Sequence, residues 1–412
     1  MYYLIGKTLG HSYSAEIHRR FGRYEYGLQA MPPEALAPFL AARTFQGLNV
    51  TIPYKSTVIP FLDGIDSAAE RIGSVNTVEN RGGRLIGHNT DYTGFLAMTD
   101  RAGICFRGKK VLILGAGGTS LTAQAAVRDA GARETVVLSR SGENHYGTLA
   151  RHLDSDVVIN ATPVGMYPDN GKTLVDLAAF EHLSGVVDVI YNPLRTPLVD
   201  DSKRRGIPAT GGLYMLVAQA AAACEYFTGT PLPKSEIDRV FGELLCEKEN
   251  IVLVGMPGSG KTTVAGLLAA RMGRELVDTD TLITERAGMP IPEIFQKYGE
   301  PELRRLEREA VEEAGKRSSA VIATGGGAVL DARNRYPLIQ NGRVYFLSRK
   351  TSGLDRTGRP LSSDADLEKM YVARLPHYLA FSDRRIENDG APEDAAAKIL
   401  EDFYAHPDTE RT

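Results

Sequence analysis

Two glycine-rich loops, each directly after a run of apolar residues, most restrict how this chain can fold. The first lies in "VLILGAGGTS" (111–120) and the second in "IVLVGMPGSGKTT" (251–263). A strand that passes through glycines into a helix leaves backbone N–H groups open at the helix N-terminus, where α/β proteins hold nucleotide phosphates. The two loops therefore predict two nucleotide-binding α/β units in one chain.

Short apolar runs separated by helical stretches continue along the whole sequence. Its 412 residues exceed what one hydrophobic core usually organises, so two or three domains are expected. Parallel strands covered by helices on both faces have continuously apolar sequences. Four runs of the first half have this character: 109–115, 134–140, 156–160 and 185–191.

We predict an α/β protein with an N-terminal α/β substrate domain, a Rossmann-like NADP domain and a P-loop kinase domain that contains a parallel sheet. The predicted boundaries are 1–100 with 212–246 for the substrate domain, 101–211 for the Rossmann-like domain, 247–250 for a polar linker, and 251–412 for the P-loop domain.

Composition excludes several other classes of protein. A net charge of −3 does not suit a dedicated nucleic-acid binder, which is usually basic. The longest apolar run, 213–227, is shorter than the roughly 20 residues that a bilayer requires, and the N-terminus has no signal-peptide pattern. Cys105, Cys224 and Cys246 lie far apart without a CxxC pair, which indicates reduced thiols and a cytoplasmic protein.

The second loop matches the pattern GxxxxGK[ST] from Gly255 to Thr262. In such a loop the lysine, here Lys261, reaches the β- and γ-phosphates of ATP, and the Thr262 hydroxyl holds Mg²⁺. The "DTD" at 278–280 ends the next strand, so Asp278 is expected at the metal and Asp280 as the base for a hydroxyl nucleophile. The other predicted ATP-binding residues of the loop are Gly258, Ser259, Gly260 and Thr263.

Further motifs of the second half are "GEPELRRLE" (299–307), "TGGG" (324–327), "RPL" (359–361) and "RLPHY" (374–378). With "GMPGSGKT" and "DTD", this set resembles shikimate kinases over about residues 250–405. The resemblance implies that Asp280, Arg304, Gly326 and Arg374 contact shikimate and that Arg359 binds ATP. Two guanidinium groups suit a ring carboxylate, because each can donate two parallel hydrogen bonds to it.

The first loop places Gly115, Gly117 and Gly118 between a strand and a helix, which is also compatible with a simple tight turn. The following strand ends in "VVLSRS", with Arg140 where NAD-binding proteins usually carry an acidic residue. A cation at this point favours the 2′-phosphate of NADP over the free ribose of NAD.

Polar clusters precede this loop, in "GHSYS" (10–14), "GLNVTIPYKS" (47–56), "GSVNT" (73–77) and "GHNTDYTG" (87–94). Amides, hydroxyls, one lysine and one aspartate suit a small polyhydroxylated anion. With "NATPVGM" (160–166), "YNPLRT" (191–196) and "GLYMLVAQ" (212–219), the series closely resembles shikimate dehydrogenases over about residues 1–245.

This resemblance implies that Lys55 is the proton donor, held in place by Asp91. It implies shikimate contacts for Ser12, Ser14, Thr51, Asn76, Tyr191 and Gln219. It implies that the NADP site is lined by Gly115, Ala116, Gly117, Gly118, Thr119, Ser120, Arg140, Ile190 and Gly212.

The two resemblances predict a bifunctional enzyme of aromatic amino acid biosynthesis that makes shikimate with NADPH and phosphorylates it with Mg-ATP. Its partners would be 3-dehydroshikimate and shikimate, with no nucleic acid or membrane. Two alternatives stay open: a ligand-sensing regulator without catalysis, or a kinase joined to an NAD-preferring quinate or shikimate dehydrogenase. The presence of Lys55, Asp91, Lys261 and Asp280 counts against the regulator.

Overall fold

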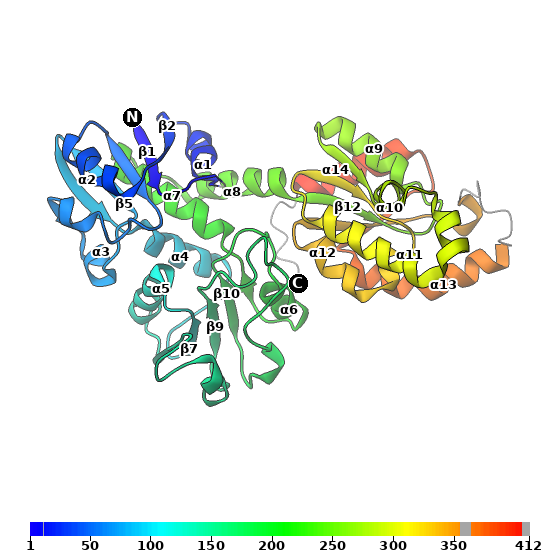
Figure 1. Ribbon diagram of the computed structural model, residues 1–412, viewed down its shortest axis with the longest axis horizontal. Helices are drawn as coiled ribbons and strands as arrows, with labels where there is room; N and C mark the ends of the chain where they lie inside the picture. Colours follow the sequence, from blue (N-terminus) through cyan, green and yellow to red (C-terminus); the bar gives the residue numbers. More distant parts are fainter. Residues whose placement is uncertain (11, 355–363, 406–412) are drawn as a thin grey trace. The chain divides into compact units, whose positions relative to one another are not determined.

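The computed structural model describes residues 1–10, 12–354 and 364–405 (Figure 1). These residues divide into two compact units, the first spanning Met1–Leu244 and the second beginning at Leu245. The described part of the chain contains three sheets flanked by helices, two in the first unit and one in the second. The predicted α/β fold class is confirmed.

The first sheet of the first unit has the strand order β2-β1-β3-β5-β6-β4 in the described residues. Its β5–β6 hairpin turns through Gly82 and Gly83, both with positive φ, which the turn requires. The strands are β1 (Tyr2–Gly6), β2 (Tyr26–Ala30), β3 (Gly47–Val50), β4 (Gly64–Ile65), β5 (Thr77–Arg81) and β6 (Arg84–His88). The helices beside them are α1 (Ser14–Phe21), α2 (Pro33–Ala42), α3 (Ser67–Ile72) and the 3₁₀ turn Ile59–Phe61.

The second sheet is wholly parallel, in the order β11-β10-β9-β7-β8 for the described strands. Since the chain goes from β7 to β8 on one side and returns to β9 on the other, the carboxyl end of β7 is a topological switch point, where ligands bind in open α/β sheets. The strands are β7 (Lys110–Leu114), β8 (Glu134–Leu138), β9 (Val157–Asn160), β10 (Gly185–Asp188) and β11 (Ala209–Thr210). Around them lie α5 (Gly118–Asp129), α6 (Pro197–Arg204) and the 3₁₀ segments Tyr146–His152 and Leu177–Ala179.

Helices α4 (Thr90–Arg101) and α7 (Leu213–Thr228) pack against each other where the two sheets of the first unit meet (Figure 1). Their contact is close because α4 carries glycine at position 94, where an added Cβ would lie 2.6 Å from the Met215 carbonyl oxygen. The apolar 213–227 run is thus a buried helix that joins the two halves of the unit, as its composition predicts.

The second unit is built on a parallel sheet in the order β13-β14-β12-β15-β16, again for the described strands. The second glycine loop follows the central strand β12, at the switch point of this sheet. The strands are β12 (Asn250–Val254), β13 (Glu275–Asp278), β14 (Ala320–Ala323), β15 (Gly342–Ser348) and β16 (Arg384–Glu387). The helices are α9 (Lys261–Met272), α10 (Thr279–Ala287), α11 (Ile291–Gly315), α12 (Arg335–Ile339), α13 (Asp364–Phe381) and α14 (Pro392–Ala405), with 3₁₀ turns at Ala328–Leu330, Ala332–Asn334 and Thr351–Gly353.

The predicted linker at 247–250 is not a loop in the structure. Helix α8 (Lys234–Lys248) runs through its first half, and β12 begins at Asn250. Between them Glu249 is buried, and its carboxylate accepts a hydrogen bond from the buried Arg343 guanidinium at 2.8 Å. The charged and polar residues of this segment predicted a linker, but an internal partner lets the Glu249 charge be buried.

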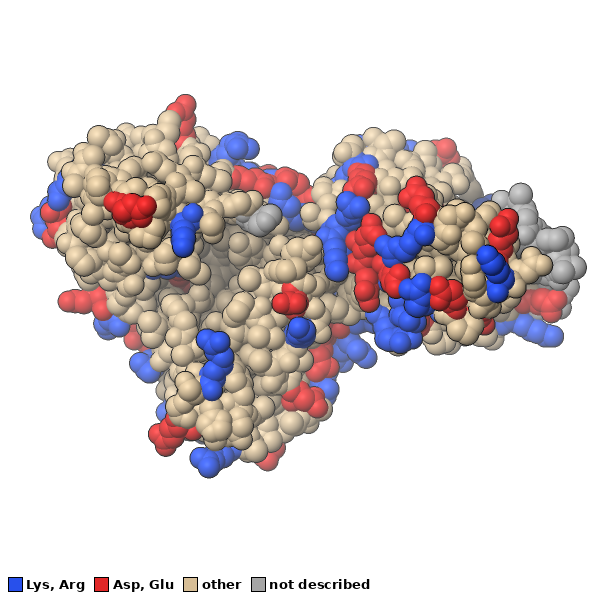
Figure 2. Space-filling view, viewed as in Figure 1, with Lys and Arg blue, Asp and Glu red and all other residues tan. Residues whose placement is uncertain are grey.

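Charged residues on the exposed faces of α10 and α11 alternate in sign (Figure 2). Arg286 pairs there with Glu309 and Glu313, and Arg305 with Glu302 and Glu309. No helix among the described residues is both long and apolar enough to cross a membrane.

Candidate active sites

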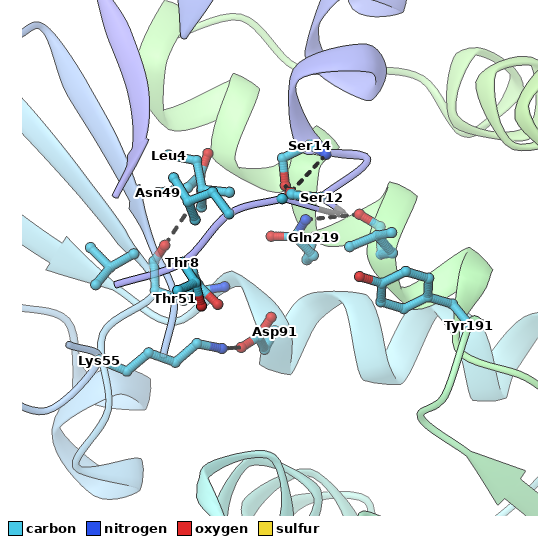
Figure 3. Close-up of a pocket in the computed structure, with 15 residues that line it drawn as sticks. Leu4, Thr8, Ser12, Ser14, Asn49, Thr51, Lys55, Asp91, Tyr191 and Gln219 are labelled. Atoms are coloured by element: carbon cyan, nitrogen blue, oxygen red, sulfur yellow. Dashed lines mark hydrogen bonds and ion pairs between the residues drawn. The ribbon is translucent and has the colours of Figure 1, made fainter. Parts of the chain in front are cut away.

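A cavity of about 570 Å³ opens in the first unit, at the carboxyl ends of β1 and β3 and beside α4 and α7 (Figure 3). Side chains from six separate stretches of sequence meet in it. The residues predicted to bind or convert the first substrate all line this one cavity: Ser12, Ser14, Thr51, Lys55, Asn76, Asp91, Tyr191 and Gln219.

Lys55 and Asp91 form an ion pair in the wall of the cavity, with Nζ 2.5 Å from Oδ2 (Figure 3). Their side chains are 25% and 14% exposed, so both are largely removed from water. Asp91 lies in the first turn of α4, where the helix dipole stabilises a carboxylate. The pair therefore holds the lysine amine at the cavity surface.

Neutral polar side chains fixed by the protein itself form the opposite part of the wall. Asn76 accepts a hydrogen bond from the Thr90 backbone N–H through Oδ1 at 2.7 Å, which turns its amide NH₂ the other way. Gln219 donates from Nε2 to the Leu216 carbonyl at 2.8 Å. The Ser12 hydroxyl donates to the Ser14 hydroxyl at 3.1 Å (Figure 3). Such fixed dipoles suit the hydroxyl groups of a small ligand.

Tyr191 enters the cavity from the loop after β10 and packs against Tyr13, with 5.5 Å between ring centroids. Burial raises the pKa of its phenol, and the neighbouring Tyr13 raises it further. The Tyr191 hydroxyl therefore stays protonated at neutral pH and can donate a hydrogen bond.

The first glycine loop fits a pyrophosphate at the N-terminus of α5. Gly115 has φ 102° and lies against Thr162, where an added Cβ would be 2.7 Å from Cγ2. Ala116, Gly117 and Gly118 are exposed, and no side chain caps the helix that Gly117 begins. The first N–H groups of the helix are thus not satisfied by a side chain and face the loop.

Two residues predicted beside this loop differ in how they are placed. Thr119 is half-buried in the first turn of α5. Ser120 is fully buried, and its hydroxyl accepts a hydrogen bond from Gln124 at 3.2 Å, so its side chain belongs to the helix packing. Any contact of Ser120 with a cofactor would be through its backbone.

Arg140, Ile190 and Gly212 lie at the same carboxyl edge of the second sheet. Arg140 is exposed, two residues beyond β8. Gly212 donates its N–H to the Ile190 carbonyl at 2.8 Å, and any Cβ on it would overlap the Val189 carbonyl oxygen. Glycine is therefore required at 212 for the β10 end and α7 to approach each other.

A buried carboxyl group supports this edge. Asp188, at the end of β10, accepts hydrogen bonds from the Thr196 hydroxyl at 2.7 Å and from the Ile190 N–H and the Asn160 amide at 3.1 Å each. Burial raises its pKa to about 6, and these hydrogen bonds partly oppose the shift. Asp188 thereby fixes the backbone of Ile190.

The second glycine loop is tightly folded between its strand and α9. Gly255, Gly258 and Gly260 have φ of 154°, 80° and 91°. Lys261 donates from Nζ to the carbonyl oxygens of Gly255 and Met256, at 2.9 Å each. The lysine amine thus lies over the loop.

The two residues predicted to hold Mg²⁺ are in contact. The Thr262 hydroxyl donates to Asp278 Oδ2 at 2.8 Å, and Thr263 follows, exposed, in the first turn of α9. A hydroxyl and a carboxylate at the end of the neighbouring strand are hard oxygen ligands that fit Mg²⁺, which takes few protein ligands when it also binds phosphates.

The predicted acceptor residues gather around the triple glycine after β14. An added Cβ on Gly325 would lie 2.5 Å from Asp280 Oδ1 and 3.2 Å from Glu307 Oε1. Arg374 donates to the Gly326 carbonyl at 3.2 Å. Arg304 donates to Glu307 at 2.7 Å and passes over Gly327. Asp280, Arg304, Gly326 and Arg374 are therefore brought together, whereas Arg359 lies outside the described residues.

Comparisons with known proteins agree on the nature of both units. The model of the shikimate dehydrogenase substrate-binding domain matches residues 4–78, and that of the shikimate 5'-dehydrogenase C-terminal domain matches 212–240. The shikimate kinase model matches residues 257–404. A shikimate dehydrogenase (NADP(+)) of Clostridium perfringens (strain 13 / Type A) is 34% identical over 264 residues, which are 59% of this chain and 97% of the relative.

The chain belongs to the shikimate dehydrogenase family and also carries a shikimate kinase domain. Among solved structures, a chorismate mutase/shikimate 5-dehydrogenase fusion protein from Clostridium acetobutylicum has a TM-score of 0.56 at 35% identity, covering 59% of this chain and 96% of that one. The shikimate 5-dehydrogenase from Thermus thermophilus in complex with NADP(H) and shikimate has a TM-score of 0.53 at 31% identity, covering 59% and 98%.

Several residues of the shikimate dehydrogenase unit were not predicted as site residues but line its cavity. Thr8 and Leu9 follow β1, and Leu216 comes from α7. Asn49, from the polar cluster at 47–56 that predicted a ligand site, also lines the cavity, where its amide accepts a hydrogen bond from Tyr26 at 2.7 Å and donates one to Thr77 at 3.0 Å. The position of Thr8 just beyond a parallel strand was the available signal, since such strand ends share one edge.

In the shikimate kinase domain the residue missed is Glu307. Burial raises the pKa of its carboxyl group above the ordinary value, and the hydrogen bond from Arg304 offsets part of this rise. The spacing of Arg304 and Glu307, three residues apart on a helix, was the available signal.

Proposed function

We propose that this chain performs two consecutive reactions on one small molecule. The first unit reduces 3-dehydroshikimate to shikimate with NADPH, and the second phosphorylates shikimate to 3-phosphoshikimate with Mg-ATP, on the route to chorismate and the aromatic amino acids. The observation that carries the proposal is the cavity in which the Lys55–Asp91 pair faces neutral hydrogen-bonding side chains. Family membership of both units supports it.

NADPH, when bound, supplies a hydride to the ring ketone. Negative charge then develops on the ketone oxygen, and Lys55 stabilises it and donates a proton there. Asp91, with Oδ2 2.5 Å from the Lys55 amine, fixes the direction in which that amine points. In the reverse reaction the neutral amine of Lys55 removes the hydroxyl proton.

Ser12, Ser14, Asn76 and Gln219 would hold the ring hydroxyls and carboxylate during this step. Their own hydrogen bonds fix them before a ligand arrives, so little ordering is needed on binding. The phenol of Tyr191, protonated at neutral pH, adds a donor on the side of the second sheet.

Mg-ATP, when bound, supplies the phosphoryl group in the second unit. Asp280 would accept the proton of the attacking hydroxyl, and Lys261 would neutralise charge on the transferring phosphate. Thr262 and Asp278 would hold Mg²⁺. Arg304 and Arg374, which both lie against the triple glycine, suit the ring carboxylate of shikimate.

A single assay tests the proposal. The full chain is mixed with 3-dehydroshikimate, NADPH, ATP and Mg²⁺, and formation of 3-phosphoshikimate is followed by mass spectrometry. We expect phosphorylated product only when both NADPH and ATP are present, and shikimate alone when ATP is left out. Binding without turnover in either half would support a ligand-sensing regulator instead.

The second alternative, an NAD-preferring quinate or shikimate dehydrogenase joined to the kinase, is tested by comparing cofactors and substrates. Arg140 at the carboxyl edge of the second sheet favours NADP, because a guanidinium pairs with the 2′-phosphate. Faster oxidation of shikimate or quinate with NAD than with NADP would establish the alternative.

A further inference from the structure

Asn388 is a buried polar residue that neither proposed reaction uses. It follows β16 directly and is 1% exposed. Its backbone N–H donates to the Ser348 carbonyl at 2.8 Å, which fixes it at the carboxyl edge of the sheet, beside the end of β15. The neighbouring Asp389 accepts a hydrogen bond from the Lys350 N–H at 2.8 Å and strengthens the same junction.

From this position Asn388 reaches into the ATP loop. Its side-chain NH₂ donates to the carbonyl oxygen of Ser259 at 2.8 Å. A carbonyl acceptor requires the donor end of the amide, so the orientation of the side chain is fixed. Its Oδ1 is buried, without a hydrogen-bond partner among the residues that the structure describes.

The contact determines which way one peptide group of the loop faces. In a trans peptide the C=O and the following N–H point in opposite directions. While the Ser259 carbonyl is directed at Asn388, the N–H of Gly260 points in the opposite direction within the same peptide plane, away from Asn388. Gly260 has φ 91°, and an added Cβ would lie 2.8 Å from Asn388 Nδ2, so the two residues fit only with glycine at 260.

We propose that Asn388 is a positioning residue for the nucleotide phosphates of the kinase site. It acts through the Ser259–Gly260 peptide, holding the Gly260 N–H ready to donate to a phosphate oxygen. The inference rests on the proposed kinase function of the second unit. It adds to that function a residue outside the GxxxxGK[ST] sequence on which nucleotide affinity depends.

The adjacent Asp389 offers a matched control. Asn388→Asp replaces an amide NH₂ by an oxygen, and Asp389→Asn makes the reverse replacement on the next residue. Of the two side chains, that of Asn388 contacts the ATP loop and that of Asp389 contacts the Lys350 N–H. Asn388→Asp replaces the donor by a carboxylate oxygen, which repels the Ser259 carbonyl and releases the peptide. Asp389→Asn keeps an oxygen acceptor for the Lys350 N–H.

The test measures MgADP affinity of the full chain by calorimetry, with KM for ATP and for shikimate measured separately. For Asn388→Asp we expect about a tenfold or larger rise in the MgADP Kd, the size of one hydrogen bond of about 1.4 kcal/mol, with a similar rise in KM for ATP. KM for shikimate should change less than about twofold, and Asp389→Asn should keep MgADP affinity within about twofold of the parent. Reduction of 3-dehydroshikimate by the same samples measures the amount of active chain.

Unchanged MgADP affinity in Asn388→Asp overturns the inference, as does a parallel rise in both KM values, which would indicate general damage to the kinase site. If thermal unfolding shows that Asn388→Asp fails to fold, Asn388→Ala decides by the same criteria, because it removes the donor without adding charge. Parent protein that neither binds MgADP nor phosphorylates shikimate would instead contradict the proposed kinase function.

Discussion

The two glycine loops lie at equivalent places, each after a central parallel strand, but their surroundings differ. Around the first loop, Gly117 and Gly118 have no atom within 4 Å of an added Cβ. Around the second, a Cβ on Gly255 would lie 2.5 Å from the Leu347 carbonyl oxygen, and a Cβ on Gly260 would lie 2.8 Å from Asn388 Nδ2. The first loop is therefore open at Gly117 and Gly118, although Gly115, directly after the strand, is confined by Thr162, whereas the second loop is enclosed both at Gly255 and at Gly260.

This difference indicates where each site obtains its selectivity. An open loop supplies N–H groups to any pyrophosphate, so discrimination between cofactors must come from residues elsewhere, such as Arg140. An enclosed loop has its conformation determined by neighbouring strands, so residues far along the sequence affect phosphate binding. If the two sites differ in this way, they should also respond independently to substitution.

The largest effects are expected from the two lysines. Lys55→Ala removes the proposed proton donor and should lower 3-dehydroshikimate reduction by about 10³-fold, within the usual range for general acid catalysis, while shikimate phosphorylation stays at the parent rate. Lys261→Ala should lower shikimate phosphorylation by about 10²–10³-fold, because it removes charge stabilisation of the transferring phosphate, and should leave 3-dehydroshikimate reduction at the parent rate. NADPH absorbance and a coupled ADP assay measure the two rates.

Lys109 and Lys316 are the matched controls. Lys109 precedes β7 and Lys316 precedes β14. Each therefore lies at the amino ends of the parallel strands, whereas the glycine loops lie at the carboxyl ends. Their replacement by alanine should leave both rates unchanged. Loss of both activities from either active-site change would show that the two units do not work independently.

A pair of glycine substitutions tests the contrast in enclosure directly. Gly255→Ala places a methyl group against the Leu347 carbonyl at a positive φ and should destabilise the second unit by about 3 kcal/mol or more, as overpacking and strain usually do. Gly117→Ala, in open space at φ −82°, should alter unfolding by less than about 0.5 kcal/mol. Chemical denaturation of each variant measures both. Equal effects would remove the distinction between the loops.

Asp188 is a buried carboxyl group at the end of β10, at the same end of the second sheet as the first glycine loop. Its titration should change the free energy of unfolding as pH changes. Because its folded pKa, about 6, lies above its ordinary value, the folded state binds the proton more tightly, and this contribution is lost as pH rises through about 6. Asp188→Asn cannot ionise. Relative to the parent, it should therefore gain up to about 3 kcal/mol of unfolding free energy between about pH 4 and pH 7.

Urea denaturation of parent and Asp188→Asn over this pH range provides the measurement. A stability difference that does not vary with pH would mean that Asp188 is ionised throughout or is equally protonated in both states.

The smallest effect is expected at Arg140, which is exposed. Arg140→Ala should lower the ratio of kcat/KM for NADPH to that for NADH by about tenfold, since an exposed phosphate contact contributes about 1–1.5 kcal/mol. Arg133, exposed on the same sheet, is the control and should keep the parent ratio on replacement by alanine. An unchanged ratio in Arg140→Ala would place cofactor selectivity in the loop itself.

Much of this architecture could be predicted because local sequence determined it. The continuous apolar runs became β7, β8, β9 and β10, although 185–191 was predicted too long, since Ile190 and Tyr191 leave β10 for the site. Strand β16, "RRIE", escaped prediction because its charged residues do not form an apolar run. Asn388, directly after it, was therefore missed as well.

The site residues divide in the same way. Lys55 and Asp91 were predicted through a resemblance, but their contact depends on how the segment after β3 meets the first turn of α4. Thr8 was missed because it acquires a role only from cavity neighbours distant in sequence. Glu307 was missed although Arg304 is only three residues away, because its place beside Asp280 and Gly325 depends on how distant segments meet. Burial of Glu249 could not be predicted for the same reason, since its partner Arg343 lies 94 residues away.

The buried pair of Glu249 and Arg343 has a consequence for separating the two activities genetically. A kinase gene that begins at codon 250 would encode a protein without Glu249. Loss of Glu249 would remove the nearer of the two carboxylates beside the buried Arg343 guanidinium, Glu249 at 2.8 Å and Asp402 at 3.8 Å, at a cost of up to about 3–5 kcal/mol. An autonomous kinase should therefore start upstream, near Leu245, where the second compact unit begins. Any fusion or splitting of the two genes that keeps a stable kinase would therefore have its junction upstream of Glu249.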